Sequence, residues 1–316
     1  MHSHPVIGVT LGDPGGIGPE IILKSLQSRS SAKIVVFGSK KVLLHHSSVL
    51  QLPFPDVDLV DIDNVLDPYF GPRPQIAGAA SIEYLERAFH FYHQGKIQAI
   101  VTCPIHKESW HLSGYHYPGQ TEYCAAKTQT SEFCMLMAGK HFRIALLSTH
   151  LSLQEALALI RQAEIEKKLR LLDREFRKLG FDHPKIGCAA LNPHASEAGA
   201  FGDEEMKQII PAIEAVRKEN IFVDGPIAPE VIFRVASAQQ KWVVLLALYH
   251  DQAMIPLKLI DFEHSANVTL GLPLIRTSPD HGTAFDIAGK GIAHAGSMHY
   301  AIDLAIEWTN RRNTLQ

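Results

Sequence analysis

The sequence predicts an α/β protein of two domains, because short apolar segments alternate with amphipathic ones along its 316 residues. A typical domain holds roughly 100–150 residues, so this length favours two of them. Many of the apolar segments are continuous and lack alternation, which is typical of strands covered on both faces. The expected sheets are therefore largely parallel.

The predicted strands are short runs of Val, Ile, Leu and Ala. The most apolar segment, from Trp242 to Tyr249, is far shorter than the ~20 residues of a membrane-spanning helix, so we interpret it as a buried strand. The predicted strands are Val6–Leu11, Lys33–Phe37, Ala99–Thr102, Arg143–Ser148, Lys185–Ala190, Trp242–Leu248 and Val268–Leu270.

The predicted helices lie between these strands in longer amphipathic segments. The first has Pro19 near its start, where a missing N–H is tolerated. The predicted helices are Pro19–Gln27, Ala80–Gln94, Leu153–Leu179, Glu204–Asn220 and Ser297–Arg311.

The composition argues against several classes of function. Hydrophobic residues make up 46% of the chain and charged residues 20%, as in an ordinary globular protein. The formal net charge of -3 is too small to indicate a nucleic-acid partner. No signal peptide and no membrane partner are expected. The four cysteines are dispersed without a C-x-x-C pair, which indicates reduced thiols in a cytoplasmic protein.

Three of the predicted strands are each followed by a histidine, namely His150, His194 and His250. Ligands in open α/β sheets bind beyond the carboxyl ends of the strands, so strands of one direction would deliver three imidazoles to one edge. Imidazole is a common ligand of zinc and other divalent ions, and three protein ligands with an open position are typical of a catalytic site. The alternative is that each histidine is a loop residue hydrogen-bonded to the backbone.

The glycine-rich segment Gly12–Glu20 joins the first predicted strand to the first helix. Glycines let backbone N–H groups approach a ligand, and the N-terminus of a helix attracts anions. The spacing matches neither the dinucleotide-binding G-x-G-x-x-G pattern nor a P-loop. A tight turn without a ligand is an equally good interpretation.

Basic and polar residues near the C-terminus form a candidate anion site. Lys258 and Arg276 can pair with a phosphate or carboxylate, and Asn267 and Arg276 flank a short apolar strand. Surface ion pairing is the alternative for the two basic residues. Thr121, near a helix start, would either bind phosphate or cap the helix.

Seven motifs occur in order along essentially the whole chain: GDPGGIGPE, TCPIHK, GQTE, STHLSL, LNPHASE, YHDQ and NVTLGLPLIRTSPDHGTAFDIAGKG. With them the sequence resembles the 4-hydroxythreonine-4-phosphate dehydrogenase family. The stretch DHGTAFDIAGKG is also similar to the loop with which isocitrate and isopropylmalate dehydrogenases hold the adenosine of their cofactor.

The resemblance implies the two-domain α/β fold of those dehydrogenases, with a cleft between the domains. A cofactor-side domain is expected over residues 1–130 plus 275–316, and a metal and dimerisation domain over residues 131–274. The resemblance also implies a homodimer whose active site lies at the subunit interface. One metal ligand then reaches in from the partner chain.

The reaction implied by the resemblance is the oxidation of 4-phosphooxy-L-threonine by NAD or NADP, with one divalent ion (zinc, magnesium or cobalt). The product, 2-amino-3-oxo-4-phosphooxybutanoate, then loses CO₂ to give 3-amino-2-oxopropyl phosphate in pyridoxal phosphate biosynthesis. The implied metal ligands are His150, His194 and His250. The implied substrate contacts are Gln120, Thr121, Lys258, Asn267 and Arg276; the cofactor contacts are His281, Gly282 and Asp286; and the candidate catalytic residues are Asp251 and Lys258.

Two positions depart from the family pattern. Family members commonly have Gly-His-Thr-Glu where this chain has Gly-Gln120-Thr-Glu, and a glutamine cannot become cationic. Glu230 stands where an aspartate is usual. The first departure leaves the substrate open, because relatives act on threonate or erythronate 4-phosphate, or on a dihydrodiol carboxylate.

Two other classes of function use similar residues. A metal-dependent phosphohydrolase or lyase would use the histidines to activate water, but few carboxylates lie near them in the sequence. A sugar-phosphate-binding protein with a structural zinc would need a closed set of four ligands, and no such set is visible.

Overall fold

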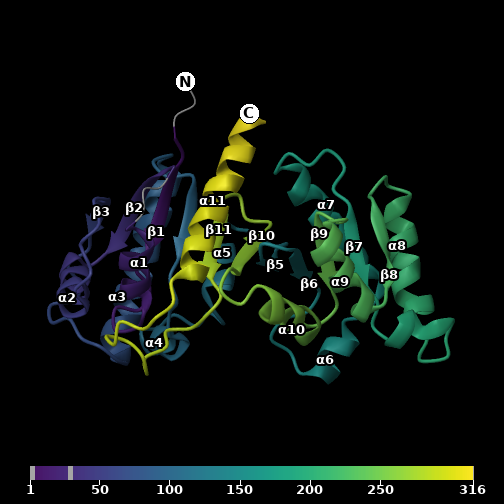
Figure 1. The fold of residues 1–316 in the computed structure, drawn as a ribbon, viewed down its shortest axis with the longest axis horizontal. Helices are drawn as coiled ribbons and strands as arrows, with labels where there is room; N and C mark the ends of the chain where they lie inside the picture. The colour runs from purple at the N-terminus through teal and green to yellow at the C-terminus, as the bar shows by residue number, and fades with distance from the viewer. Residues whose placement is uncertain (1–3, 28–30, 316) are drawn as a thin grey trace. The chain divides into compact units, whose positions relative to one another are not determined.

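The computed structural model describes residues 4–27 and 31–315, so the first residues of the N-terminus lie outside it. The chain divides into two compact units (Figure 1). Unit 1 takes in the residues up to Ser131 together with Leu272–Asn313, and unit 2 takes in Glu132–Gly271 with the C-terminal residues from Thr314. Strands and helices alternate in both units, which confirms the predicted α/β class.

Unit 1 contains five parallel strands in the order β3-β2-β1-β4-β11. The strand order reverses between β1 and β4, which makes their carboxyl ends the usual place for a ligand. The strands are β1 (Val6–Thr10), β2 (Lys33–Gly38), β3 (Asp58–Asp61), β4 (Ala99–Thr102) and β11 (Ile275–Pro279). The helices are α1 (Gly18–Ser25), α2 (Lys40–Leu50), α3 (Pro74–His93), α4 (Lys107–Leu112), α5 (Gln120–Lys127) and α11 (Gly296–Thr314).

Unit 2 contains six strands in the order β10-β5-β6-β9-β7-β8. Five of them run in the same direction, but β5 is antiparallel to both of its neighbours, so the expectation of parallel strands needs this correction. The strands are β5 (Cys134–Ala138), β6 (Arg143–Leu146), β7 (Ile186–Ala189), β8 (Val223–Ile227), β9 (Val244–Ala247) and β10 (Ala266–Leu270). The helices are α6 (Leu153–Ala158), α7 (Gln162–Arg177), α8 (Ile210–Arg217), α9 (Pro229–Gln239) and α10 (His250–Ile260).

Two predicted helices are interrupted. The segment Leu153–Leu179 forms α6 and α7, because Leu159 and Ile160 donate to carbonyls only three residues back and the chain then leaves the helix. The side chain of Gln208 accepts the N–H of Gln162 at 2.9 Å and so stabilises the start of α7. The segment Glu204–Asn220 begins as a π-helical turn, Glu205–Ile209, before α8 starts.

A continuous core fixes β6, β7 and β9 against the helices that follow them. Alternate residues of β6, Ile144 and Leu146, share one cluster with Leu245 and Ala247 of β9. Ala253 and Leu257 bring α10 into the same cluster, and Ile232, Phe233 and Ala236 bring in α9. The carboxyl ends of these strands are therefore held on a packed scaffold.

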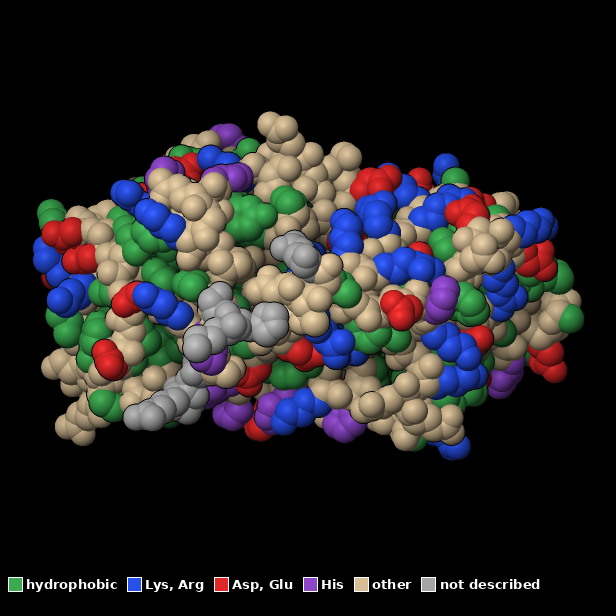
Figure 2. Space-filling model, turned by 90° about the horizontal axis from the view of Figure 1, so that it is seen from above, with side chains coloured by type: hydrophobic (Ala, Val, Ile, Leu, Met, Phe, Trp, Pro, Cys, Tyr) green, Lys and Arg blue, Asp and Glu red, His purple; other side chains and the backbone are tan. Residues whose placement is uncertain are grey.

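The surface of unit 2 carries both signs of charge. Over this part of the molecule Figure 2 shows Lys and Arg side chains interspersed with Asp and Glu. Along α7, for example, Arg170 pairs with Glu166 and Glu219, and Arg177 pairs with Asp173. All four cysteines are free and buried. Within the described residues, none of the helices has the length and apolar character needed to span a membrane.

Candidate active site

The three histidine-bearing segments follow neighbouring strands. β9 pairs in parallel with β6 on one side and with β7 on the other. Their carboxyl ends therefore lie at one edge of the sheet, which confirms the expected shared direction. His250 is the first residue of α10, a helix that the sequence did not predict, so it is not the loop residue of the alternative interpretation. Asp251 and Lys258 belong to the same helix.

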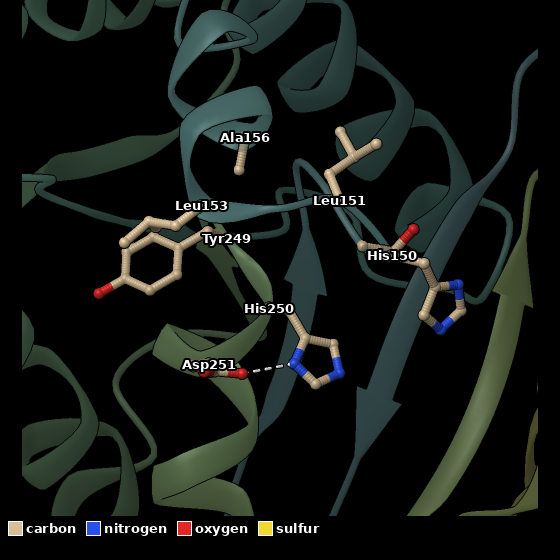
Figure 3. Close-up of a pocket in the computed structure, with 8 residues that line it drawn as sticks. His150, Leu151, Leu153, Ala156, Tyr249, His250 and Asp251 are labelled. Carbon is tan, nitrogen blue, oxygen red and sulfur yellow. Dashed lines mark hydrogen bonds and ion pairs between the residues drawn. The ribbon is translucent and has the colours of Figure 1, made fainter.

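His150 and His250 lie together in one pocket. Their ring centroids are 6.3 Å apart, and the pocket has a volume of about 310 Å³. Figure 3 shows the two imidazoles side by side, one from the segment after β6 and the other from the start of α10. The pocket is lined by Thr149, His150, Leu151, Leu153, Ala156, Tyr249, His250 and Asp251.

Carboxylates hold one ring nitrogen of two of the histidines. Nδ1 of His250 lies 2.7 Å from Oδ1 of Asp251 (Figure 3), and Nδ1 of His194 lies 3.1 Å from Oε1 of Glu230. Metal-bound histidines usually donate their second ring N–H in this way, which leaves Nε2 for the cation. These two carboxylate–imidazole pairs have the chemistry of metal-binding histidines, and Glu230 keeps a carboxylate at its position.

His194 is not among the residues that line this pocket. Its side chain is 67% exposed, and its ring lies 6.2 Å from that of Phe201. Over residues 4–27 and 31–315 of one chain, no group of three or more His, Cys, Asp or Glu side chains could hold a metal ion. A single chain thus brings together two of the three predicted ligands.

Buried side chains connect the ends of the three strands. Ser148, after β6, donates to the carbonyl of Leu248 at 3.0 Å. Gln252 of α10 accepts the N–H of Leu248 at 2.7 Å and donates to the carbonyl of Ala190, after β7, at 2.8 Å. No local sequence signal marks Gln252, because its role depends on which strands are neighbours.

A second group of predicted site residues surrounds Arg276 in unit 1. Arg276 is only 3% exposed; its guanidinium donates to Thr102 Oγ1 at 2.6 Å and to Thr121 Oγ1 at 3.4 Å. Burial lowers the pKa of Arg276, while nearby Cys124 and Glu122 raise it. This buried cation provides a strong attraction for an anion.

The start of α5 lies beside this guanidinium. Gly119 is the N-cap and no side chain caps the helix, so Thr121 contacts Arg276 and does not act as a cap. The amide nitrogen of Gln120 donates to the carbonyl of Cys103 at 3.0 Å, which uses one of its two N–H groups. The first N–H groups of α5 have no acceptor within the helix and suit an anion.

Lys258 and Asn267 both lie in unit 2. Lys258 is half-buried near the end of α10, and its ammonium lies 5.2 Å from the centre of the Phe262 ring. Asn267 is half-buried in β10, and its Oδ1 accepts no hydrogen bond within the described chain. A buried acceptor without a partner would be stabilised by a hydrogen bond from a ligand N–H or O–H group.

The glycine-rich segment forms a tightly packed turn. A side chain at Gly15 would lie 2.2 Å from the carbonyl oxygen of Gly71, and one at Gly18 would lie 2.4 Å from that of Leu11. Ile17 donates its N–H to the carbonyl of Thr283 at 2.9 Å. The geometry favours the interpretation as a turn that supports neighbouring backbone.

The predicted cofactor contacts His281, Gly282 and Asp286 follow β11 in a segment without regular secondary structure. The end of this segment is fixed to α1. Lys24 donates to the carbonyls of Gly291 and Ala293 at 2.9 and 2.7 Å, and buried Glu20 accepts the N–H of Ala293 at 2.9 Å. Two residues of the first helix thus anchor this loop.

Asp13 is a buried acid at the carboxyl end of β1. It is 1% exposed, and its Oδ1 accepts the N–H of Gly15 at 2.9 Å. Burial raises the pKa of Asp13 to about 6, although the Gly15 N–H and the charge of His106 lower it. Burial also lowers the pKa of nearby His46 to about 4.

Asp13→Asn is expected to stabilise the folded state at pH 7 and not at pH 3.5. Between the unfolded pKa of 3.8 and the folded pKa of about 6, only the folded state keeps the proton, so wild-type stability falls as the pH rises through this window. Above pH 6 the variant gains up to ~3 kcal/mol in free energy of unfolding, since each pKa unit corresponds to 1.36 kcal/mol. Urea unfolding of wild type and variant at pH 7 and pH 3.5 separates the effect of Asp13 from that of His46, which is present in both proteins. An equal difference in the free energy of unfolding at the two pH values would contradict the raised pKa of Asp13.

The sequence and the fold of this chain match those of a known protein family. Residues 30–305 match the model described as pyridoxal phosphate biosynthetic protein PdxA. The chain belongs to the PdxA family. It is 40% identical to a 4-hydroxythreonine-4-phosphate dehydrogenase of Aquifex aeolicus, over 94% of this chain and 96% of that protein.

Other PdxA-family relatives differ in the substrate that they are named for. A D-threonate 4-phosphate dehydrogenase of Pectobacterium atrosepticum is 38% identical over 96% of this chain and 98% of that protein. The crystal structure of a 4-hydroxythreonine-4-phosphate dehydrogenase from Klebsiella pneumoniae superposes with a TM-score of 0.88 at 37% identity, covering 96% of this chain and 99% of that one. The PdxA-family chain is therefore an enzyme of the dehydrogenase class, which argues against the phosphohydrolase and binding-protein alternatives.

Proposed function

We propose that this chain oxidises 4-phosphooxy-L-threonine with NAD or NADP and a divalent metal ion, and that the 3-keto product decarboxylates to 3-amino-2-oxopropyl phosphate. The observation that carries the proposal is the pairing of His150 and His250 in one pocket, with Asp251 against Nδ1 of His250. This is the arrangement expected of ligands that leave a coordination position for substrate.

We assign His150, His194 and His250 to one metal site that is completed between two copies of the chain. A set of imidazoles suits zinc, with cobalt or magnesium as alternatives. When bound, the ion would lower the pKa of the substrate hydroxyl, and NAD or NADP would take up the two electrons. Asp251 orients His250 and is the candidate acceptor for the hydroxyl proton.

The phosphate of the substrate is assigned to Arg276 and the start of α5. The guanidinium offers a planar fork, Thr121 offers a hydroxyl, and the first N–H groups of α5 have no acceptor within the helix. Gln120 adds an amide at the same place, where the family commonly has an imidazole. Lys258 is assigned to the substrate carboxylate and is the second candidate catalytic residue.

One feature favours a substrate with an amino group at C2 over one with a hydroxyl there. Asp251 puts a carboxylate in the pocket, and a carboxylate pairs more strongly with an ammonium than with a hydroxyl. Oδ1 of Asn267, a buried acceptor without a donor in the described chain, suits either group. D-threonate 4-phosphate is the second candidate, because relatives of both names are about equally similar to the chain.

A homodimer is supported by apolar side chains around the end of α10. Ile255, Leu259 and Phe262 are 61%, 81% and 68% exposed. Exposed apolar patches of this kind mark interaction sites, and a second copy on this helix would approach the pocket formed at its other end. We further assign the cofactor to His281, Gly282 and Asp286, and the protein to the cytoplasm, in keeping with its free cysteines.

A turnover screen tests the proposed function. The purified protein is incubated with NAD or NADP and each of 4-phosphooxy-L-threonine, D-threonate 4-phosphate and erythronate 4-phosphate, and absorbance is followed at the NADH band. The proposal predicts the highest kcat/KM with 4-phosphooxy-L-threonine, loss of turnover on chelation, and recovery with a divalent metal. A higher kcat/KM with D-threonate 4-phosphate would establish the second candidate, and no nicotinamide reduction with any of the three would overturn both.

A further inference from the structure

The segment that carries His194 has a rare backbone conformation. Five consecutive residues, none of them glycine, have φ between 45° and 64°, from His194 to Ala198. This left-handed region is unfavourable for L-residues because Cβ approaches the following carbonyl oxygen, and residues normally visit it singly. A run of five persists only where surrounding contacts fix it, and such strain gathers at functional sites.

The buried carboxylate of Glu205 supplies the strongest of these contacts. Glu205 is 0% exposed, and its Oε1 accepts the backbone N–H groups of Leu191 and Asn192 at 2.8 and 2.7 Å. Its Oε2 accepts the side-chain amide of Asn192 at 2.8 Å. Hydrogen bonds to an ionised acceptor are roughly twice as strong as neutral ones, so three of them hold the chain firmly just before the turn.

The turn itself is closed by its own backbone. Asn192 accepts the N–H of Ala195 at 3.2 Å, and buried Ser196 accepts the N–H groups of Gly199 and Phe201 at 3.0 and 3.1 Å. These bonds fix the far end of the turn, whereas Glu205 fixes its beginning. The direction in which His194 leaves the sheet therefore depends on both.

The imidazole of His194 has little packing of its own. Its side chain is 67% exposed, and it pairs with the carboxylate of Glu230, itself 54% exposed. Side-chain contacts alone would leave several ring positions available. The backbone of the turn must then determine where the imidazole is presented.

We propose that Glu205 is a positioning residue, which holds the left-handed turn so that His194 is preorganised to bind a divalent cation. The metal role of His194 comes from the proposed function, whereas the restraint of the turn by Glu205 does not depend on it. Glu205 begins the π-helical turn Glu205–Ile209, a local distortion that is frequent at functional sites. The distortion brings the carboxylate to the backbone of Leu191 and Asn192.

Glu205→Gln tests the proposal, because the amide has nearly the same shape but replaces one acceptor by a donor. We expect its affinity for Zn²⁺, titrated into metal-free protein against a chromophoric chelator, to fall about 10- to 100-fold, the typical effect of losing a residue that orients a ligand. The matched control is Glu204→Gln, which makes the same change in a side chain that accepts the Asn192 amide at 2.7 Å but binds no backbone N–H of Leu191 or Asn192. Its affinity should stay within about threefold.

A glycine substitution separates positioning from general stability. Ala195→Gly on the Glu205→Gln background lowers the strain of the left-handed turn, so it should recover part of the lost Zn²⁺ affinity. If Glu205→Gln does not fold, Asn192→Ala keeps Glu205 but removes the side-chain bond, and a loss of affinity is again expected. Unchanged affinity in the variant that folds would overturn the proposal.

Hydrogen exchange of the metal-free protein tests the restraint of the turn by Glu205 separately from the proposed metal site. In the variant the amides of Leu191 and Asn192 should exchange at least about tenfold faster than in the wild type, whatever metal the enzyme uses. If the wild type does not bind Zn²⁺, Co²⁺ or Mg²⁺, the proposed metal site fails while faster exchange still supports the restraint of the turn. Equal exchange in both proteins would refute the role of Glu205 even in an active enzyme.

Discussion

Replacing His194 with alanine is expected to lower kcat about 10³-fold while the protein stays folded. The loss of one ligand weakens the electrostatic stabilisation that the cation supplies, worth several kcal/mol, and each 1.36 kcal/mol is a factor of ten in rate. The side chain is 67% exposed, so its removal should change the free energy of unfolding by no more than about 0.5 kcal/mol. Steady-state kinetics, metal content after dialysis and urea unfolding measure these three quantities.

The matched control for this variant is His183→Ala. His183 is also an exposed histidine of unit 2, and its ring lies 5.2 Å from that of Phe222, away from the strand ends that carry the candidate site. It should keep wild-type kcat and metal content. A His194→Ala enzyme that turns over at the wild-type rate without bound metal would contradict the mechanism.

Arg276→Met is expected to lower kcat/KM by about 10²- to 10³-fold with little loss of stability. A charged hydrogen-bond partner of the substrate phosphate is removed, which typically costs about 2–5 kcal/mol in binding. The guanidinium is almost fully buried, and its burial lowers the pKa of Arg276, so the folded protein already bears a desolvation penalty for this charge. An apolar side chain of similar length removes that penalty.

Arg276→Lys tests the geometry of the same contact. Lysine keeps the charge but loses the planar fork that donates to Thr102 and Thr121, so most of the defect should remain. Kinetics against substrate concentration should place the change mainly in KM for the phosphorylated substrate, with KM for the nicotinamide cofactor unchanged. An unaltered substrate KM in Arg276→Met would remove Arg276 from the phosphate site.

The parts of the fold that the sequence predicted are those with a strong local signal. All seven predicted strands are present, since continuous apolar runs are typical of strands buried on both faces. β3 (Asp58–Asp61) was missed because it is a half-exposed run with acidic ends, and β8 (Val223–Ile227) because it contains Gly-Pro. β11 was missed because its sequence IRTSP is mostly polar, so Arg276 lies inside this strand and Asn267 inside β10, and the two residues do not flank one strand as expected. β5 was missed because its sequence CMLMA has little β propensity, and its neighbouring strands supply the stabilisation.

Only part of the candidate site could be predicted from local sequence patterns. The positions of His150, His194 and His250 after three strands were predictable, but the adjacency of β6, β9 and β7 is a property of the sheet. α10 was missed because Pro256 lies inside it and resembles a helix breaker in the sequence. The left-handed turn at His194 contains no glycine at its five positions, and Glu205 resembles an ordinary acidic residue at a helix start, so neither gave a sequence signal.

Crystals of the zinc-loaded protein, with diffraction recorded at the zinc absorption edge, would show whether the three histidines bind one cation. We expect one anomalous peak per active site, bound by nitrogens of His150, His194 and His250 at about 2.0–2.1 Å, with both copies of the chain contributing. A peak on other residues, or three imidazoles that lie apart in every pairing of subunits, would contradict it.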